Sequence, residues 1–487
     1  MEATQKITRV PFFRQYVAGG DYAVGTPRMR PITNPFNGAV IAQVAVGTVA
    51  DAETALARAA AAFAETRALS AAERHAVLRR IEAGLTARRE EFAQGIVAEG
   101  GKTIRDARTE VDRATLVFGL AADEARRWGG EVLPLDINAA SRGRVGLTRR
   151  FPVGTVAALT PFNFPLNLVA HKVAPALAVG APVILKPAER TPLTALRLAE
   201  LVSESGYPRA AFSVLTPDVP QEVAELLATD ERAPVFSFTG SDIVGWRLKG
   251  LANRKRATLE LGGNAGVIVA AGADAAVAAA RCVTGAFANA GQVCISVQRI
   301  FVHESLFDTF AAHLVEGARL LVLGNPAEET TDLGPMITPT ARENALALVR
   351  AAEAAGATAL LRGAATGYAH LPPTVLTGTT AAMRVRSEEA FAPVVCVEPF
   401  RAFADALALV NEGRFGLQAG VFTPNIAEAF AAWEGIEAGG VVINDVPQYR
   451  VDNMPYGGEK ASGFGREGVR YAMEEMTAVR LLVMNAG

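Results

Sequence analysis

The sequence predicts an α/β protein with two doubly wound domains and a small β arm, and three patterns support this prediction. Helical periodicity dominates residues 48–127. From about residue 153, short apolar runs alternate with helical stretches, and a second series of the same kind begins at Thr258. Such alternation is typical of a parallel sheet that is covered by helices on both faces. The chain has 487 residues, which is enough for two or three domains.

Capping and periodicity predict the helices between residues 48 and 127. Ser70 and Glu73 have the spacing of a capping box, in which each side chain satisfies the backbone N–H of the other residue. Four apolar residues then recur on one helical face, namely Val77, Leu78, Ile81 and Leu85. We therefore expect paired helices near the start of the chain.

Short apolar runs give the expected strands of the two sheets. The first series comprises 153–159, 182–185 and 235–238. A helical stretch at 192–204 lies between its members. The second series comprises 265–270, 373–376, 393–398, 419–422 and 441–443. Residues 138–151 are too polar and alternating for a core strand, so we expect an edge hairpin or arm there.

Composition and charge exclude several classes of protein. Hydrophobic residues make up 50% of the chain and charged residues 20%, which excludes a largely disordered protein. The net charge is −2, so no basic excess attracts nucleic acid or anionic lipid. The apolar runs are too short or too interrupted to span a membrane, and no N-terminal apolar run indicates a signal peptide. We expect a soluble cytoplasmic protein without nucleic-acid or membrane partners.

Cysteine, histidine and glycine spacing excludes further motifs. The three cysteines lie far apart and the five histidines lack metal-ligand spacing, so we expect neither a disulfide framework nor a metal site. Residues 463–468 match G-x-G-x-x-G but lie too close to the C-terminus for the required βαβ unit. Residues 101–103 lack the correctly spaced glycine of a phosphate-binding loop.

Two residues are candidates for chemistry. Cys294 lies in a short turn, Gly291-Gln-Val-Cys-Ile-Ser, where its thiol could face a cleft, although a buried packing role is the alternative. Glu260 lies at the end of an apolar strand, immediately before Leu-Gly-Gly. Burial there would raise the pKa of the carboxyl and make it a general base near neutral pH, whereas a surface carboxylate is the alternative.

Seven segments together give the chain a resemblance to the aldehyde dehydrogenase superfamily of NAD(P)-dependent enzymes. They follow that family's order over nearly the whole chain: Thr160-Pro-Phe-Asn-Phe-Pro165, Lys186-Pro-Ala-Glu189, Phe238-Thr-Gly-Ser241 with Gly245, Leu259-Glu-Leu-Gly-Gly263, Gly291-Gln-Val-Cys294, Glu388-Glu-Ala-Phe-Ala-Pro393, and Asn444 before Met454-Pro-Tyr-Gly-Gly458. Each segment is weak evidence alone, but the ordered set is specific. Residues 444–458 resemble the subgroup that includes lactaldehyde, glycolaldehyde and phosphonoacetaldehyde dehydrogenases.

The resemblance implies a mechanism and assigns three residues to it. Cys294 would be the nucleophile that forms a thiohemiacetal and then a thioester with the substrate. The Asn163 amide and the Cys294 backbone N–H would stabilise the oxyanion, and Glu260 would activate the hydrolytic water. The expected reaction is NAD-dependent oxidation of a small aldehyde to its acid. A CoA-acylating semialdehyde dehydrogenase, disfavoured by Glu260, and a non-enzymatic protein retaining the fold are the alternatives.

The resemblance also implies a site for NAD, with NADP possible. Gly240 and Ser241 end a strand and begin a helix whose N-terminus would bind the pyrophosphate, with Gly245 permitting close approach. Lys186 and Glu189 would hold the adenosine ribose. We expect NAD to be preferred because a 2′-phosphate would meet the Glu189 carboxylate.

Near the nicotinamide, the resemblance implies contacts from Glu389 and Phe391, for which a solvated loop acid and a core aromatic are the alternatives. The remaining cofactor positions that it implies are Thr160, Pro161, Phe162, Leu261 and Gly262. Phe162 stands where the family often has Trp, Ala392 where Gly is commoner, and Ser296 where Ala is common. These departures concern the fit of the substrate rather than the reaction.

The resemblance further implies a domain organisation and an oligomeric state. Residues 1–137 and 152–257 would form the NAD-binding domain, and residues 258–465 the catalytic domain. Residues 138–151 and 466–487 would form an oligomerisation arm. Residues 477–484 also have the pattern of a strand with an edge to pair, so we expect a homodimer or homotetramer.

The sequence leaves the aldehyde open. Arg450 and Arg108 are candidates to bind an anionic tail, because guanidinium groups bind carboxylate and phosphonate in bidentate fashion. Val293 precedes the nucleophile, where relatives that oxidise phosphate- or phosphonate-bearing aldehydes commonly have Arg. We therefore expect neutral short aldehydes slightly ahead of anionic ones, with Arg450 and Arg108 as structural or surface residues.

Overall fold

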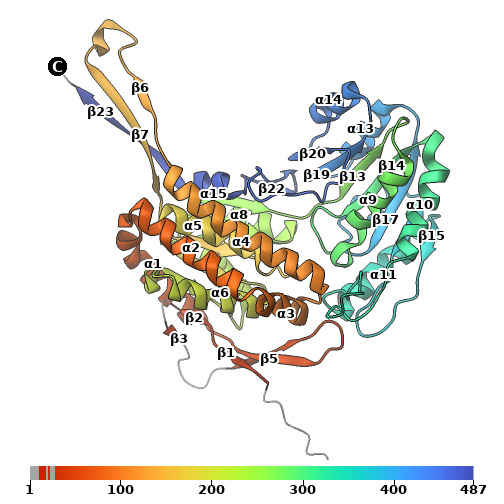
Figure 1. The fold of residues 1–487 in the computed structure, drawn as a ribbon, viewed down its shortest axis with the longest axis horizontal. Helices are drawn as coiled ribbons and strands as arrows, with labels where there is room; N and C mark the ends of the chain where they lie inside the picture. The colour runs from red at the N-terminus through yellow and green to blue at the C-terminus, as the bar shows by residue number, and fades with distance from the viewer. Residues whose placement is uncertain (1–9, 18–19, 22–27, 486–487) are drawn as a thin grey trace, which may run out of the picture.

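The computed structural model describes residues 10–17, 20–21 and 28–485 and shows two helix-covered sheets and a projecting arm (Figure 1). The predicted N-terminal helices are confirmed as α1 (Val49–Ala68), α2 (Ala71–Ala87), α3 (Arg89–Gly100) and α4 (Ile104–Arg127). The capping box is also confirmed, since Glu73 N donates to Ser70 Oγ at 3.2 Å and Ser70 N donates to Glu73 Oε2 at 2.7 Å. A small sheet precedes these helices and comprises β1 (Phe12–Phe13), β5 (Val40–Ala45) and β4 (Met29–Thr33).

The first large sheet has a parallel centre with antiparallel strands at both edges. Its order is β22 (Gly463–Phe464), β12 (Arg256–Glu260), β11 (Val235–Thr239), β8 (Val156–Leu159), β9 (Val183–Lys186), β10 (Phe212–Val214), β2 (Tyr16–Val17) and β3 (Gly20–Asp21). One core joins it to α2–α4, α5 (Asn167–Val179) and α6 (Leu193–Glu204). A second core joins it to α1, α7 (Pro220–Thr229) and α8 (Asp242–Leu251).

The second large sheet is parallel except at β15. Its order is β15 (Thr358–Arg362), β16 (Thr374–Thr377), β17 (Val394–Phe400), β14 (Val297–His303), β13 (Ala265–Val269), β19 (Gln418–Phe422) and β20 (Gly440–Ile443). The helices around it are α9 (Ala275–Phe287), α10 (Phe307–Arg319), α11 (Pro339–Ala354), α12 (Arg384–Ser387), α13 (Phe403–Asn411) and α14 (Ile426–Gly435). The expected α/β architecture is confirmed.

The connection between the two sheets positions the site. The strand β12 ends at Glu260, and β13 begins in the other sheet at Ala265, after four intervening residues. The domain boundary expected at residue 258 therefore falls inside β12, which still belongs to the first sheet. The short strands β18 (Phe415–Gly416) and β21 (Glu459–Lys460) also pair near this junction.

A three-stranded arm extends away from both sheets (Figure 1). It is formed by β6 (Val132–Pro134), β7 (Arg144–Pro152) and β23 (Thr477–Asn485), and β23 pairs with β7 over nine residues. The helix α15 (Val469–Glu475) leads into β23 but packs against α4 and α5. Within the part of the chain that the structure describes, no helix is both long and apolar enough to cross a membrane.

Candidate active site

A strained turn carries Cys294 out of the end of α9. Residues 289–291 have φ angles of 50°, 55° and 67°, and the first two of them, Asn and Ala, rarely adopt this left-handed conformation. The buried Gln292 holds the turn, because Ile337 N donates to its Oε1 at 2.8 Å and its Nε2 donates to Asn289 O at 3.1 Å. Strain that is maintained by surrounding contacts is typical of functional sites.

Two glycines allow the turn to lie against both neighbouring segments. A Cβ at Gly263 would be 2.1 Å from the carbonyl oxygen of Cys294, and a Cβ at Gly291 would be 2.1 Å from the carbonyl oxygen of Ala392. Both distances are well inside van der Waals contact. The double glycine after Glu260 therefore brings the strand β12 and the Cys294 turn together.

The Cys294 thiol is partly buried beside a tyrosine. Its Sγ lies 3.2 Å from the Tyr456 hydroxyl oxygen. Burial raises the pKa of the Cys294 thiol to about 11, an effect that the hydrogen bond to Tyr456 opposes and the nearby Glu260 carboxyl adds to. Cys282 and Cys396 are buried in the core of the second sheet, so Cys294 is the thiol with access to a pocket.

Asn163 contacts the same turn from the first domain. Its side chain is buried, and Nδ2 donates to the carbonyl oxygen of Gln292 at 2.9 Å. An amide nitrogen carries two hydrogens, so this bond leaves one of them for a further acceptor. The predicted oxyanion residue therefore lies against the nucleophile turn.

Glu260 is buried at the end of β12, and neither of its carboxyl oxygens has a hydrogen-bond partner. Burial, and after it the neighbouring Glu467 carboxylate, raise the pKa of Glu260 well above its ordinary value. Lys172 Nζ donates to Glu467 Oε1 at 2.7 Å, and although burial opposes ionisation, this ammonium holds the pKa of Glu467 below its ordinary value. Glu260 is consequently suited to accept a proton near neutral pH.

Several residues around the site were not predicted from sequence. Lys172 and His171 lie in α5, a helix whose residues are all buried, and their charges in an otherwise apolar segment were the available signal. His171 Nε2 lies 2.9 Å from Asp452 Oδ1, which also accepts from Arg113 Nη2 at 2.6 Å. His171 therefore belongs to a buried charged network.

A pocket of about 270 Å³ opens beside Cys294. Its lining includes the aromatic residues Phe164 and Tyr456 and the cations Lys102, Arg113 and Arg450. Arg450 therefore faces the site, as one of the two arginines that the sequence offered.

Arg108 lies elsewhere. Its guanidinium binds Glu90 Oε2 at 2.9 Å and Glu329 Oε1 at 2.5 Å on the surface. The expected surface role of Arg108 is confirmed.

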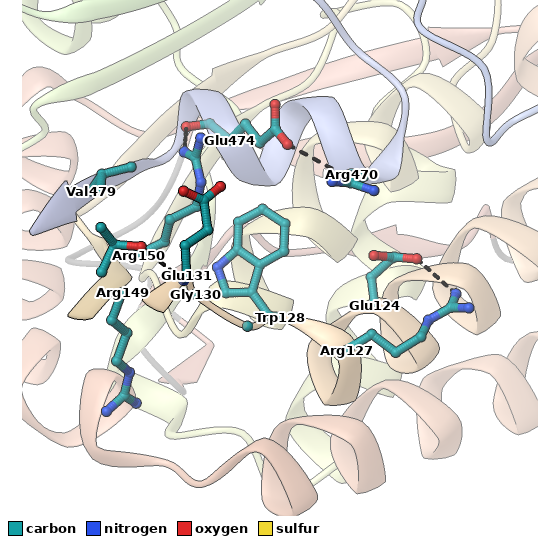
Figure 2. A pocket seen from close by; sticks show the side chains of 12 residues that line it. Glu124, Arg127, Trp128, Gly130, Glu131, Arg149, Arg150, Arg470, Glu474 and Val479 are labelled. Carbon is teal, nitrogen blue, oxygen red and sulfur yellow. Dashed lines mark hydrogen bonds and ion pairs between the residues drawn. The ribbon is translucent and has the colours of Figure 1, made fainter. Parts of the chain in front are cut away.

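A larger pocket, of about 500 Å³, lies at the base of the arm between α4, β7 and α15 (Figure 2). Two ion pairs join residues of its lining, that of Arg127 Nη2 and Glu124 Oε1 at 2.7 Å and that of Arg470 Nε and Glu474 Oε1 at 3.4 Å. No cysteine lines it. The pocket beside Cys294 is therefore the candidate active site.

The cofactor residues implied by the sequence lie at the strand ends of the first sheet. Ser241 is the N-cap of α8, and its Oγ accepts from Val244 N at 3.4 Å, so the first N–H groups of this helix are available to a phosphate. A Cβ at Gly245 would be 2.4 Å from Leu261 Cδ2, which gives this glycine a role in packing α8 on the sheet. Lys186, the last residue of β9, forms an ion pair with Glu189.

The residues implied to bind near the nicotinamide are brought together at the double glycine. Gly263 N donates to Glu389 Oε1 at 2.9 Å, and a Cβ at Gly262 would be 2.5 Å from Glu389 Oε2. Burial raises the pKa of Glu389 to about 7. The Phe391 and Phe162 rings meet edge to face with centroids 5.8 Å apart. Carboxylates for two riboses and a helix N-terminus for a pyrophosphate fit a dinucleotide.

Comparison with known proteins matches this chain to one family along almost its whole length. The model of the aldehyde dehydrogenase family matches residues 23–482. A 3-sulfolactaldehyde dehydrogenase of Priestia aryabhattai is 42% identical over 479 residues, covering 98% of this chain and 99% of its own. A lactaldehyde dehydrogenase of Methanococcus vannielii is 37% identical, covering 86% of this chain and 89% of its own.

Solved structures give the same match. Aldehyde dehydrogenase 21 of Physcomitrella patens, in complex with the reaction product succinate, has a TM-score of 0.94 and 42% identity, covering 98% of both chains. The glyceraldehyde-3-phosphate dehydrogenase of Methanocaldococcus jannaschii, complexed with NADP, has a TM-score of 0.90 and 36% identity, covering 95% of this chain and all of that one.

Proposed function

The chain belongs to the aldehyde dehydrogenase family, and we propose that it oxidises a short aldehyde to its carboxylic acid with Cys294 as nucleophile. NAD is its cofactor, with NADP possible. The observation that supports the proposal most directly is the convergence of the Cys294 turn, Asn163 and the buried Glu260 at the junction between the sheets. The two named relatives act on short substituted aldehydes, which suits a pocket of about 270 Å³.

The chemistry begins at Cys294. Its thiolate, formed when the thiol loses its proton to solvent, attacks the aldehyde carbon and forms a thiohemiacetal, while the Cys294 backbone N–H and the second Asn163 N–H donate to the oxyanion. NAD, when bound, supplies the hydride acceptor. Loss of the hydride leaves the acyl group on Cys294 as a thioester.

Glu260 completes the turnover by taking a proton from the water that attacks this thioester. Its raised pKa makes it a stronger base than an ordinary carboxylate, and the neighbouring Glu467 carboxylate favours the protonated form of Glu260 that results. The acid product then leaves and Cys294 returns as a thiol.

The alternative is a CoA-acylating enzyme, in which the thioester passes to CoA rather than to water. The buried Glu260, unbonded and raised in pKa, favours hydrolysis. The test is NADH formation from a panel of short aldehydes with and without CoA. We expect oxidation that is independent of CoA, with the free acid as product. A strict requirement for CoA, or formation of an acyl-CoA, would contradict the proposal.

We also propose that the protein acts as a homodimer or homotetramer in the cytoplasm. The arm leaves apolar side chains of β23 about half exposed, as for Leu481 (53%) and Leu482 (55%). An isolated strand edge with such side chains is usually covered by a partner.

A further inference from the structure

We propose that Tyr456 is a catalytic residue, whose hydroxyl donates a hydrogen bond to the Cys294 sulfur whenever that sulfur is a thiolate. This role rests on the proposed function, to which it adds a group that stabilises the nucleophile. Tyr456 belongs to the segment Met454-Pro-Tyr-Gly-Gly458, which carries part of the family resemblance, and the sequence alone assigned no role to it.

The Tyr456 hydroxyl and the Cys294 thiol are hydrogen-bond partners. The oxygen lies 3.2 Å from Sγ, and in the neutral pair either atom can be the donor. A phenolic hydroxyl can donate or accept, whereas a thiolate can only accept. Loss of the thiol proton therefore makes the hydroxyl the donor. A hydrogen bond to a charged group is about twice as strong as one between neutral groups.

Within the described part of the chain, no other side chain forms a hydrogen bond with this sulfur. Activated cysteines commonly have an imidazolium or ammonium beside them. The ammonium of the pocket, Lys102 Nζ, instead donates to Glu110 Oε2 at 2.6 Å, and Asn163 Nδ2 donates to the carbonyl oxygen of Gln292 at 2.9 Å. The thiolate therefore depends on Tyr456 for a side-chain donor.

The charges around Cys294 leave this hydrogen bond as the main support for ionisation. Burial raises the pKa of the thiol, and the Glu389 and Glu260 carboxyls add to the effect. The hydrogen bond from Tyr456 is the largest opposing influence, ahead of the Arg450 guanidinium. The remaining charged side chains of the pocket lining all come from α4, namely Lys102, Asp106, Glu110 and Arg113.

The hydroxyl is fixed in position and keeps its proton. Tyr456 is 3% exposed, and its backbone exchanges two hydrogen bonds with Glu467, at 3.0 Å from Tyr456 N and at 2.6 Å to Tyr456 O. Burial raises the pKa of Tyr456 well above its ordinary value, so the phenol stays neutral. The Arg450 guanidinium carbon lies 3.6 Å from the ring centre. A cation over the ring withdraws electron density from it, which strengthens the O–H as a donor.

The hydrogen bond acts at two steps of the reaction. It first stabilises the thiolate that attacks the aldehyde carbon, after the thiol proton has gone to solvent. Attack converts the sulfur into an uncharged thioether, which is a weak acceptor. When water has added to the thioester, the C–S bond breaks and its electron pair returns to the sulfur, so the hydroxyl donates to a thiolate again. Tyr456 transfers no proton at either step.

The test removes only the hydroxyl, in Tyr456→Phe, and measures the labelling of Cys294 by iodoacetamide at pH 9. Loss of a hydrogen bond to a charged group should lower the thiolate fraction about 10- to 100-fold. Because a more basic thiolate is also more nucleophilic, the labelling rate should fall by less, about three- to tenfold. The matched control, Tyr449→Phe, removes a hydroxyl from the same loop at a residue that is 50% exposed and should label at the wild-type rate.

A second reagent separates this effect from a change in access to the thiol. N-Ethylmaleimide is larger than iodoacetamide, and its reaction should slow by about the same factor, because both reagents need the thiolate. Labelling of Tyr456→Phe at or above the wild-type rate would overturn the proposal.

Kinetics with NAD and lactaldehyde, or whichever short aldehyde is oxidised fastest, test the two steps. In Tyr456→Phe, the single-turnover rate of NADH formation and kcat should each fall about tenfold or more, and a wild-type kcat would also overturn the proposal. If no aldehyde is oxidised but Tyr456→Phe still slows labelling, the proposed function is rejected and the bond to the thiolate is retained.

Discussion

The nucleophile of this protein is held in a protonated state by its surroundings. Burial raises the pKa of the Cys294 thiol to about 11, so only a small fraction is thiolate at neutral pH in the protein alone. The pKa of the neighbouring Glu260 is likewise raised above its ordinary value, by burial and by the Glu467 carboxylate. A thiolate at Cys294 and a carboxylate at Glu260 would repel each other, which opposes the ionisation of both groups at once.

This state of Cys294 predicts an alkylation profile. Below its pKa the thiolate fraction rises about tenfold per pH unit, so the rate of labelling by iodoacetamide should rise steadily from pH 7 to pH 10. Peptide mass spectrometry should find the label on Cys294 and not on Cys282 (0% exposed) or Cys396 (1% exposed). A labelling rate that levels off below pH 9 would contradict the raised pKa.

Cys294→Ala should abolish aldehyde oxidation, whereas Cys282→Ala and Cys396→Ala should remain active.

Glu260→Gln should separate the two halves of the reaction. Formation of the thioester needs no base at this position, whereas its hydrolysis does, so we expect one equivalent of NADH in a burst followed by slow turnover. The loss in steady-state rate should be about 10² to 10⁴. In the wild type, activity should fall with falling pH through a value above the ordinary pKa of a glutamate, because protonated Glu260 cannot act as base. Stopped-flow absorbance measures both, and a wild-type steady-state rate in Glu260→Gln would reject the assignment.

Glu189 should determine the preference for NAD. Burial raises its pKa, but the Lys186 ammonium outweighs this effect and holds the pKa below the ordinary value, so the carboxylate is charged at neutral pH. A 2′-phosphate adds about −1.5 to −2 charge beside it. We expect kcat/KM for NAD to exceed that for NADP by about 10- to 100-fold and Glu189→Gln to narrow the gap. Equal values in the wild type would show that Glu189 does not contact the ribose.

At the scale of elements, the site depends on how closely β12 approaches the Cys294 turn. Gly263→Ala would place a Cβ 2.1 Å from the Cys294 carbonyl oxygen, so the turn must move away from β12. A displacement of about 1 Å at the reacting atoms can cost about 10² in rate, and we expect kcat/KM to fall by at least that factor. Gly100→Ala, at the end of α3, meets nothing within 4 Å and is the matched control. Retention of wild-type kcat/KM in Gly263→Ala would show that the turn accommodates the methyl group elsewhere.

Sequence patterns predicted elements that consist of uninterrupted apolar runs, such as β8 and β13. They did not predict β14, because Gln298 and Arg299 interrupt its apolar pattern. Both side chains are buried on distant partners, since Gln298 Nε2 donates to Val385 O at 2.9 Å and Arg299 Nη2 donates to Asn264 O at 2.9 Å. A pattern local in sequence cannot reveal such pairing.

The residues of the site likewise fall into those that local motifs identify and those whose partners are distant in the chain. The family motifs identified Cys294 and Glu260 as candidates, and the structure places both residues at the junction between the two sheets. The pairing of Lys172 with Glu467 joins residues 295 positions apart, so neither could be identified from its neighbours in the chain. The position of Arg450 in the pocket lining, and of Arg108 among surface glutamates, is likewise a property of three-dimensional packing, which is why the sequence offered Arg450 and Arg108 as equals.

At the scale of the whole molecule, the arm predicts assembly. Apolar side chains that are about half exposed occur on both faces of β23, including Val479, Leu482 and Val483. We expect light scattering after size exclusion to give the mass of a dimer or tetramer at micromolar concentration. Replacing Leu481 and Val483 by Asp should shift that mass toward the monomer, because charges in an apolar interface are costly to bury. A monomeric wild type would contradict the proposed assembly.

Because β23 pairs with β7, the complete arm can form only late in the synthesis of the chain. Thr477 lies opposite Pro152, so the ribosome must add more than 300 residues after β7 before its partner strand exists. Glu467, the partner of the buried Lys172, is made almost as late. A nascent chain that stops before Glu467 therefore lacks β23 and leaves the buried Lys172 ammonium without its carboxylate partner.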